Sequence, residues 1–383
     1  MYSIALKMLF GDRGKYIAMI VGITFASLIM TQQPSILVGL LSRTYSFVGD
    51  VGLPDIWVMD PGVQFVEEHK PLRDVDLARV RGVPGIEWAA PLYKGIVMAK
   101  LPDGNTKSLD LTGLDDATLI GAPSRILEGS LLDLRRADAV LVSREAANTQ
   151  LRVKTATGTR PLETGDVIEI NDRRAVVAGM IKTTRNFVLQ PQVYTTYTRA
   201  VSYAPPNRRQ LTYILVKAKA GQSLSALTDD ITKQTGLAAY TQDGFEKLNL
   251  DYWMKNTGIP INFGISVFLG FVVGAAIVGQ TFLTFVNENL KHYAALKSMG
   301  LRNSILVRMV VLQAAVVGII GYGIGVGITA LFGLQVTDSV LAFRMPPILL
   351  VFAGVGVLAI VTIAALFSVR KVIRVDPAVV FRT

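Results

Sequence analysis

The chain has 383 residues, 51% of them hydrophobic, and its mean hydropathy of +0.42 excludes a protein that is soluble throughout. It contains no cysteine, which excludes disulfides, thiolate metal sites and cysteine nucleophiles. The net charge is +10, but residues 44–258 carry 26 Lys/Arg against 25 Asp/Glu and therefore hold only +1 of it. The excess flanks apolar segments, which indicates membrane topology and speaks against a nucleic-acid partner.

The N-terminal part predicts an amphipathic cytoplasmic segment at 1–15 and a first membrane span at 16–41. This span is too long for the apolar core of a signal peptide and lacks an A-x-A-like cleavage site, so we expect a retained anchor. Near its outer end, the amides of Gln32 and Gln33 beside Pro34 need partners at that depth. They predict a kink that faces an outer cavity, or amides that a neighbouring helix satisfies.

Residues 44–258 predict a large α+β domain outside the membrane. Strand and helix patterns indicate a strand-helix part at 51–113 and 192–250, interrupted by a β-rich insertion at about 114–191. The single histidine of this domain, His69, lies in the charged stretch EEHK and is expected to be solvated. No catalytic, metal-binding or cofactor-binding constellation emerges from these residues.

Three more spans follow, and each is long enough to cross a bilayer. The spans lie at 259–286, 305–334 and 347–368. Connections at 287–303 and 335–346 join them, and a tail at 369–383 follows the last span. Small residues recur four positions apart within two of these spans, which predicts close helix packing at Gly270, Gly274, Gly321 and Gly325.

Basic residues at the span ends set the orientation. They cluster before the first span, between the second and third, and after the fourth. Because Lys and Arg are retained on the inner side of a membrane, we expect both termini and residues 287–303 in the cytoplasm and the large domain outside.

The cytoplasmic connection predicts a short amphipathic helix between two spans. Its apolar residues recur at helical spacing, and Gly300 supplies a left-handed stop. A basic loop that rests on anionic headgroups is the alternative, but it would need neither the apolar side nor the glycine.

The stretch HYAALKSMGLRN at 292–303 resembles the cytoplasmic segment of ABC transporter permeases of the MacB/FtsX type (type VII, mechanotransmission), closest to their DevC-like branch. The C-terminal VRKVIRVDPAVVFRT resembles the same branch, and the phrases LTGLDD, LEGSLL, AVLVSREAAN and LETGDVIEI follow the order of the family's outside domain. The Tyr-Ala-Ala-Leu that begins at Tyr293 stands where many MacB-like permeases have Arg-Glu-Ile-Gly, which favours the DevC-like branch.

This resemblance implies a non-enzymatic permease of the bacterial inner membrane that forms a homodimer and binds a separate cytoplasmic ABC ATPase. The ATPase, rather than this chain, would bind ATP and Mg, and a periplasmic domain would move in response. Membrane lipid, a membrane-fusion adaptor and a TolC-like outer-membrane channel are further implied partners, with an amphiphilic substrate for efflux. The ATPase-coupling residues would be Leu290, Lys291, Tyr293, Leu296, Lys297, Met299 and Gly300, with the tyrosine, Leu296 and Met299 as apolar anchors.

Two alternatives remain open. An FtsX-like protein would signal to a cell-wall hydrolase and transport nothing, although its outside domain is usually much smaller than 44–258. A LolC-like permease would extract lipoproteins and would need a hook-like element that the sequence does not identify.

Overall fold

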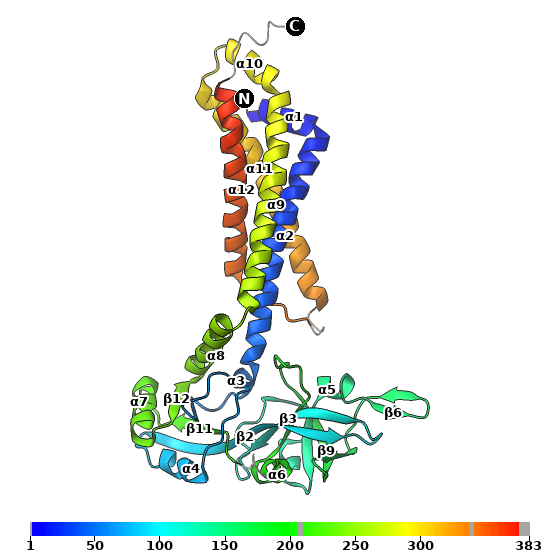
Figure 1. Cartoon of the computed structure of the whole chain (residues 1–383), viewed down its shortest axis with the longest axis vertical. Helices are drawn as coiled ribbons and strands as arrows, with labels where there is room; N and C mark the ends of the chain where they lie inside the picture. The colour runs from blue at the N-terminus through cyan, green and yellow to red at the C-terminus, as the bar shows by residue number, and fades with distance from the viewer. Residues whose placement is uncertain (1, 206–209, 337–340, 375–383) are drawn as a thin grey trace. The chain divides into compact units, whose positions relative to one another are not determined.

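The computed structural model describes residues 2–205, 210–336 and 341–374 (Figure 1). The chain divides into two compact units, a helical unit of Met1–Leu40 with Thr257–Thr383 and an α+β unit of Leu41–Asn256. The tail motif at 376–382, and residues 337–340 of the expected outer connection, lie outside the described residues.

The helical unit contains four helices, among the described residues, that are long and apolar enough to cross a membrane. They extend past the apolar stretches expected from the sequence, because backbone hydrogen bonding in a helix does not stop where the side chains become polar. The helices of this unit are α1 (Tyr2–Gly11), α2 (Arg13–Thr44), α9 (Ile259–Glu288), α10 (Leu290–Ser298), α11 (Asn303–Val336) and α12 (Pro347–Ile373).

Helix α9 approaches α2 closely at two glycines. A Cβ atom at Gly270 would lie 2.6 Å from Cγ2 of Ile29, and one at Gly274 would overlap with Cβ of Ala26. Because no larger residue fits at this distance, the absence of side chains at Gly270 and Gly274 sets the separation of the two helices.

Helix α11 approaches α2 in the same way. A Cβ at Gly321 would lie 2.7 Å from Cβ of Ile23, and one at Gly325 would lie 2.7 Å from the carbonyl oxygen of Thr24. The Oγ of Ser27 also donates to the carbonyl oxygen of Tyr322 at 3.2 Å. α2 therefore packs closely against both α9 and α11 at these glycines.

Helix α2 continues through Pro34 without ending. Gln32, Gln33 and Pro34 are each partly exposed, and the backbone N–H of Arg344 donates to the carbonyl oxygen of Ser35 at 3.0 Å. An outer cavity at the two amides stays a prediction.

The first half of the α+β unit is an antiparallel sheet in the order β12-β1-β11-β2. Side chains of α4 and α7 pack on one face of it, and Phe47 and Phe245 from α3 and α8 pack near Trp57 on the other. Its elements are α3 (Ser46–Asp50), β1 (Ile56–Met59), α4 (Asp74–Arg81), β2 (Ile86–Lys100), β11 (Tyr213–Ala218), α7 (Leu224–Thr235), β12 (Ala238–Thr241) and α8 (Gln242–Asn256).

The second half continues the same sheet in the order β2-β3-β10-β5-β9-β4, with β8 paired to β2 and β9. Its core is formed mainly by aliphatic residues of these strands and of α5 and α6. Its elements are β3 (Thr106–Leu114), β4 (Arg125–Glu128), the 3-10 helix η1 (Leu131–Arg135), β5 (Ala139–Ser143), α5 (Arg144–Asn148), β6 (Val153–Thr155), β7 (Gly158–Arg160), β8 (Val167–Ile170), β9 (Arg173–Lys182), β10 (Gln192–Thr196) and α6 (Tyr197–Tyr203).

Strand β2 belongs to both halves. Its residues 86–92 pair with β11, and its residues 93–100 pair with β3. The expected division into 51–113 with 192–250 and an insertion at about 114–191 is therefore corrected, because β3 and β10 pair within the second half. The chain passes between the halves inside one continuous apolar strand, where no loop composition marks the boundary.

Candidate functional site

Helix α10 is set between α9 and α11 by two defined breaks. At the first, the side chain of Asn289 donates from Nδ2 to the carbonyl oxygen of Phe285 at 2.8 Å, which also accepts from the backbone N–H of Asn289 at the end of α9. At the second, Gly300 has φ of +89°, and its N–H donates to the carbonyl oxygen of Lys297 at 3.0 Å. The N–H of Leu301 donates to the carbonyl oxygen of Leu296 at 3.2 Å, which completes a Schellman motif.

The apolar side of α10 faces the protein itself. Tyr293 and Ala294 are fully buried and Leu296 is 7% exposed, in the core shared by the helical unit. Tyr293 and Leu296 were expected to be apolar anchors for an ATPase; the structure buries both side chains against the bundle, and their contact with an ATPase stays a prediction. The same helical spacing that would suit a partner groove also buries one side of a helix against its own bundle.

The buried side is held by a hydrogen-bonded chain through three helices. Tyr293 Oη donates to Oε1 of Gln313 on α11 at 2.9 Å, and Nε2 of Gln313 donates to the carbonyl oxygen of Ala5 on α1 at 2.8 Å. Burial raises the pKa of Tyr293 to about 12, so its hydroxyl remains a donor at physiological pH. α1, α10 and α11 are thereby joined at one end of the helical unit.

The lysines of this segment have different roles. Lys297 Nζ donates to the carbonyl oxygen of Ile373, the last residue of α12, at 2.8 Å. A cation at this position also opposes the negative end of the helix dipole. Lys291 is exposed, as are His292 and Met299, the latter by 69%. The accessible face of α10 and its C-cap therefore consists of these three side chains and Ser298, with Leu290 only partly exposed.

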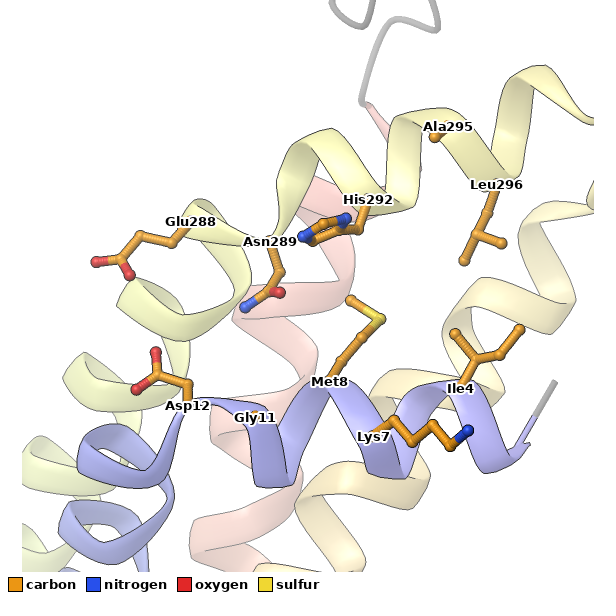
Figure 2. Close-up of a pocket in the computed structure, with 10 residues that line it drawn as sticks. All are labelled: Ile4, Lys7, Met8, Gly11, Asp12, Glu288, Asn289, His292, Ala295 and Leu296. Atoms are coloured by element: carbon orange, nitrogen blue, oxygen red, sulfur yellow. The ribbon is translucent and has the colours of Figure 1, made fainter.

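A groove of about 580 Å³ lies between α1 and α10 (Figure 2). Ile4 and Met8 point from α1 into the space beneath Leu296, with Lys7 and His292 also at the groove. The sequence analysis missed α1 as the wall of this groove. Ala5 and Leu9, four residues apart and both fully buried, were the signal that this short helix packs on the bundle.

The end of this groove is acidic but partly neutralised. Lys15 forms ion pairs with Asp12, at 2.6 Å, and with Glu288. The hydrogen bond from Lys15 holds the pKa of Asp12 below its usual range. A charged rim around an apolar floor suits a protein partner better than a small apolar ligand.

A second group of functional interest is buried in the α+β unit. Nζ of Lys94 donates to both carboxylate oxygens of Asp110 at 2.7 Å, and both side chains are almost fully buried. Lys94 also lies 4.0 Å from the ring centroid of Phe47. The sequence signal was a lysine and an aspartate inside otherwise apolar strands, which the sequence analysis did not use.

His69 is not a solvated surface residue as expected. It is partly buried and lines a cavity of about 170 Å³ together with Lys94 and Thr212. Within the described part of the chain, no group of three or more His, Cys, Asp or Glu could hold a metal ion.

Comparisons with known proteins define the class. The family description "MacB-like periplasmic core domain" matches residues 17–234, more than half of the chain, and "FtsX-like permease C-terminal" matches residues 264–377. The chain belongs to the MacB/FtsX family of ABC transporter permeases. The predicted fold class, four membrane helices with a large α+β domain between the first and second, is confirmed.

Individual relatives and solved structures are only distantly similar to this chain. Two uncharacterized ABC transporter permeases of Mycobacterium tuberculosis, from strains CDC 1551 and H37Rv, are each 24% identical over 328 residues, which is 81% of this chain and 79% of theirs. The extracellular domain of the noncanonic ABC-type transporter YknZ from Gram-positive bacteria is 12% identical, with a TM-score of 0.34 over 49% of this chain and 98% of that one. The periplasmic region of MacB from Actinobacillus actinomycetemcomitans is 14% identical, with a TM-score of 0.37 over 55% of this chain and 96% of that one.

Proposed function

We propose that this permease is the membrane subunit of an ATP-driven export system in which a separate cytoplasmic ATPase drives movement of the α+β unit. The observation that carries the proposal is the mounting of α10. A helix closed by a Schellman motif at Gly300 and joined through Tyr293 to α11 and α1 cannot move without them. Force applied to its exposed face is transmitted to the membrane helix α11 and to α1 as a rigid-body displacement.

The contact surface for the ATPase is the outward face of α10 with the groove against α1. Met299 supplies an exposed apolar contact, Lys291 and His292 supply positive or polar ones, and Lys7 adds a cation at the groove. Tyr293, Leu296 and Lys297 act behind this surface by holding α10 on the bundle. A central apolar contact with a charged rim is the usual anatomy of a protein interface.

The rest of the proposed system is what the sequence resemblance implies. Two copies of the chain form a homodimer in the inner membrane with both termini cytoplasmic, and each binds an ATPase subunit that carries ATP and Mg. The α+β unit lies in the periplasm, where it works with an adaptor and a TolC-like duct to release an amphiphilic substrate. The arrangement is that of the DevC-like branch.

The test uses the full-length chain co-expressed with a candidate ABC ATPase from the same organism. Met299→Asp with Lys291→Glu is expected to abolish co-purification of the ATPase. The first change replaces an apolar contact by a charge and the second reverses a charge, and both residues are exposed. Met98→Asp, at a methionine of β2 that is 50% exposed, is the matched control and should leave the complex intact.

Two further measurements separate coupling from signalling. Reconstituted wild-type complex is expected to raise its ATPase rate when an adaptor is added, and the double variant is not. Unchanged ATPase binding by Met299→Asp with Lys291→Glu contradicts the proposed contact. Stimulation by a cell-wall hydrolase instead of an adaptor favours FtsX-like signalling.

A further inference from the structure

A basic hollow of about 750 Å³ lies in the second half of the α+β unit, and the coupling mechanism makes no use of it. Side chains from η1, the start of β5, the start of β9 and α6 converge on it. Its charged lining is Asp116, Arg135, Asp138, Arg173, Arg174 and Arg199.

Arg199 is held in place by neutral groups only. Its Nη1 donates to the carbonyl oxygens of Leu134 at 3.0 Å and Ala139 at 3.1 Å, and its Nη2 donates to that of Arg136 at 3.0 Å. Among the described residues, no carboxylate forms an ion pair with it. Its guanidinium is therefore oriented in advance while its positive charge is left uncompensated.

Arg173 and Arg174 enter the hollow from the first two positions of β9. Arg174 meets Asp138 at 3.4 Å, an exposed pair that contributes little to stability. Arg173 is exposed and has no carboxylate partner within the part of the chain that the structure describes. Both guanidinium groups can therefore turn toward a ligand at little cost.

The remaining polar groups do not cancel this charge. The carboxylate of Asp116 accepts hydrogen bonds from the backbone N–H and, at 2.7 Å, from the hydroxyl of Thr198. Tyr203 Oη donates to the carbonyl oxygen of Arg174 at 2.9 Å, and burial raises the pKa of Tyr203 to about 12, so it stays neutral. Four guanidinium groups thus face two carboxylates, Asp116, which accepts from Thr198, and Asp138, which pairs with Arg174.

We propose that this hollow binds a small polyanion through phosphate groups or adjacent carboxylate groups. A guanidinium offers two parallel N–H donors that match a carboxylate or phosphate edge. The volume falls within the range of sites for small ligands, roughly 300 to 1,000 Å³. A concave surface with one arginine fixed in advance favours a compact anion over an extended acidic protein segment.

The test measures binding of inorganic pyrophosphate and of citrate to the purified full-length chain in an uncharged detergent, by calorimetry at low salt. Arg173→Gln with Arg174→Gln is expected to weaken binding at least about tenfold, which corresponds to about 1.4 kcal/mol. Neither side chain supports the fold through a buried bond, so the variant should keep the tryptophan fluorescence of the wild type.

Arg125→Gln is the matched control. Arg125 is exposed and lies on β4 opposite Lys182, at the end of β9 far from Arg173 and Arg174. It should bind both probes as the wild type does. A short-chain phosphatidic acid that competes with pyrophosphate identifies a lipid headgroup as the source of the anion, and failure to compete identifies a soluble one.

Three results overturn the proposal. They are the absence of saturable binding, equal binding by wild type and the Arg173→Gln, Arg174→Gln variant, and a preference for polyglutamate over both small probes by more than about tenfold. None of these results bears on ATPase binding at α10, so the two proposals fail independently.

Discussion

Tyr293 on α10 donates its hydroxyl hydrogen to Oε1 of Gln313 on α11 at 2.9 Å, and both side chains are fully buried. Gln313 in turn donates a hydrogen bond to the backbone carbonyl oxygen of Ala5 on α1. A residue in the middle of α10 thus binds inward, and in the proposed contact with an ATPase only its exposed neighbours face the partner.

Removing either member of this pair should destabilise the protein. Tyr293→Phe leaves Oε1 of Gln313 buried without its donor, and a loss of about 1 kcal/mol is expected. Gln313→Leu leaves the tyrosine hydroxyl without an acceptor and should cost at least as much. Thermal melting of the detergent-solubilised chain, followed by size-exclusion chromatography, measures both.

The double variant isolates the interaction between the two side chains. We expect its loss of stability to be smaller than the sum of the single losses by about 0.5 kcal/mol or more. Strictly additive losses would show that the hydrogen bond between Tyr293 and Gln313 adds nothing to stability.

Two glycines of α11 should respond differently to the same substitution. At Gly325 a Cβ would lie 2.7 Å from the carbonyl oxygen of Thr24, whereas at Gly327 nothing lies within 4 Å. Gly325→Leu should therefore push α2 away and abolish monodisperse protein, while Gly327→Leu should be tolerated. Size-exclusion profiles measure this, and equal behaviour of the two variants would contradict the close contact of α2 with α11.

The buried ion pair of the α+β unit should be costly to break on one side. Lys94→Met leaves the carboxylate of Asp110 buried without a counter-charge, and we expect a loss of about 3 to 5 kcal/mol. Lys100→Met on the same strand is the control, because its pair with Glu169 is exposed and should contribute under about 1 kcal/mol.

Tryptophan fluorescence reports selectively on unfolding of the α+β unit. The three tryptophans of the chain, Trp57, Trp88 and Trp253, all belong to the α+β unit. Adding Asp110→Asn to Lys94→Met should recover most of the lost stability, since Asn186 keeps an acceptor at that position. No recovery would mean that packing of the lysine stem, rather than its charge, dominates.

Glu67 should make the α+β unit less stable as pH rises. Burial raises the pKa of Glu67 from 4.5 to about 7, with a smaller opposing effect of Lys94. Since the folded pKa exceeds the unfolded one, the stabilisation is complete below pH 4.5 and is lost as pH rises through about 7. At about 1.4 kcal/mol per unit, the full effect is of the order of 3 kcal/mol.

Denaturant melts of the full-length chain between pH 5 and pH 8, monitored by tryptophan fluorescence, measure how the free energy of unfolding changes with pH. Glu67→Gln should remove most of this pH dependence, because the amide does not titrate. Burial also raises the pKa of Asp50, which adds an effect of the same sign. A wild-type stability that rises over this interval would contradict the assignment.

The orientation can be tested directly because the chain has no cysteine. His292→Cys should react with a membrane-impermeant maleimide only after the cells are permeabilised. Ala156→Cys, at the exposed turn between β6 and β7, should react in cells whose outer membrane alone is opened. The opposite pattern would reverse the topology and remove the cytoplasmic ATPase contact.

Local sequence patterns were sufficient for the membrane helices, the α+β character of the large domain and the stop at Gly300. These features depend on interactions between neighbours in the chain: about twenty consecutive apolar residues, alternating strand residues, and a backbone angle that glycine adopts without strain. The family resemblance at 292–303 was visible for the same reason, because it is a contiguous stretch.

Other features depended on which surfaces meet in space. The periodicity of 290–299 required one buried side, but whether Tyr293 and Leu296 faced a partner or their own bundle depended on the positions of α1 and α11. Likewise, Gly325 and Gly327 are chemically identical, and only the approach of α2 distinguishes them. The four arginines of the basic hollow come from elements far apart in the sequence, and burial and long-range pairing, which bring such residues together, are properties of the folded chain that no short window of residues contains.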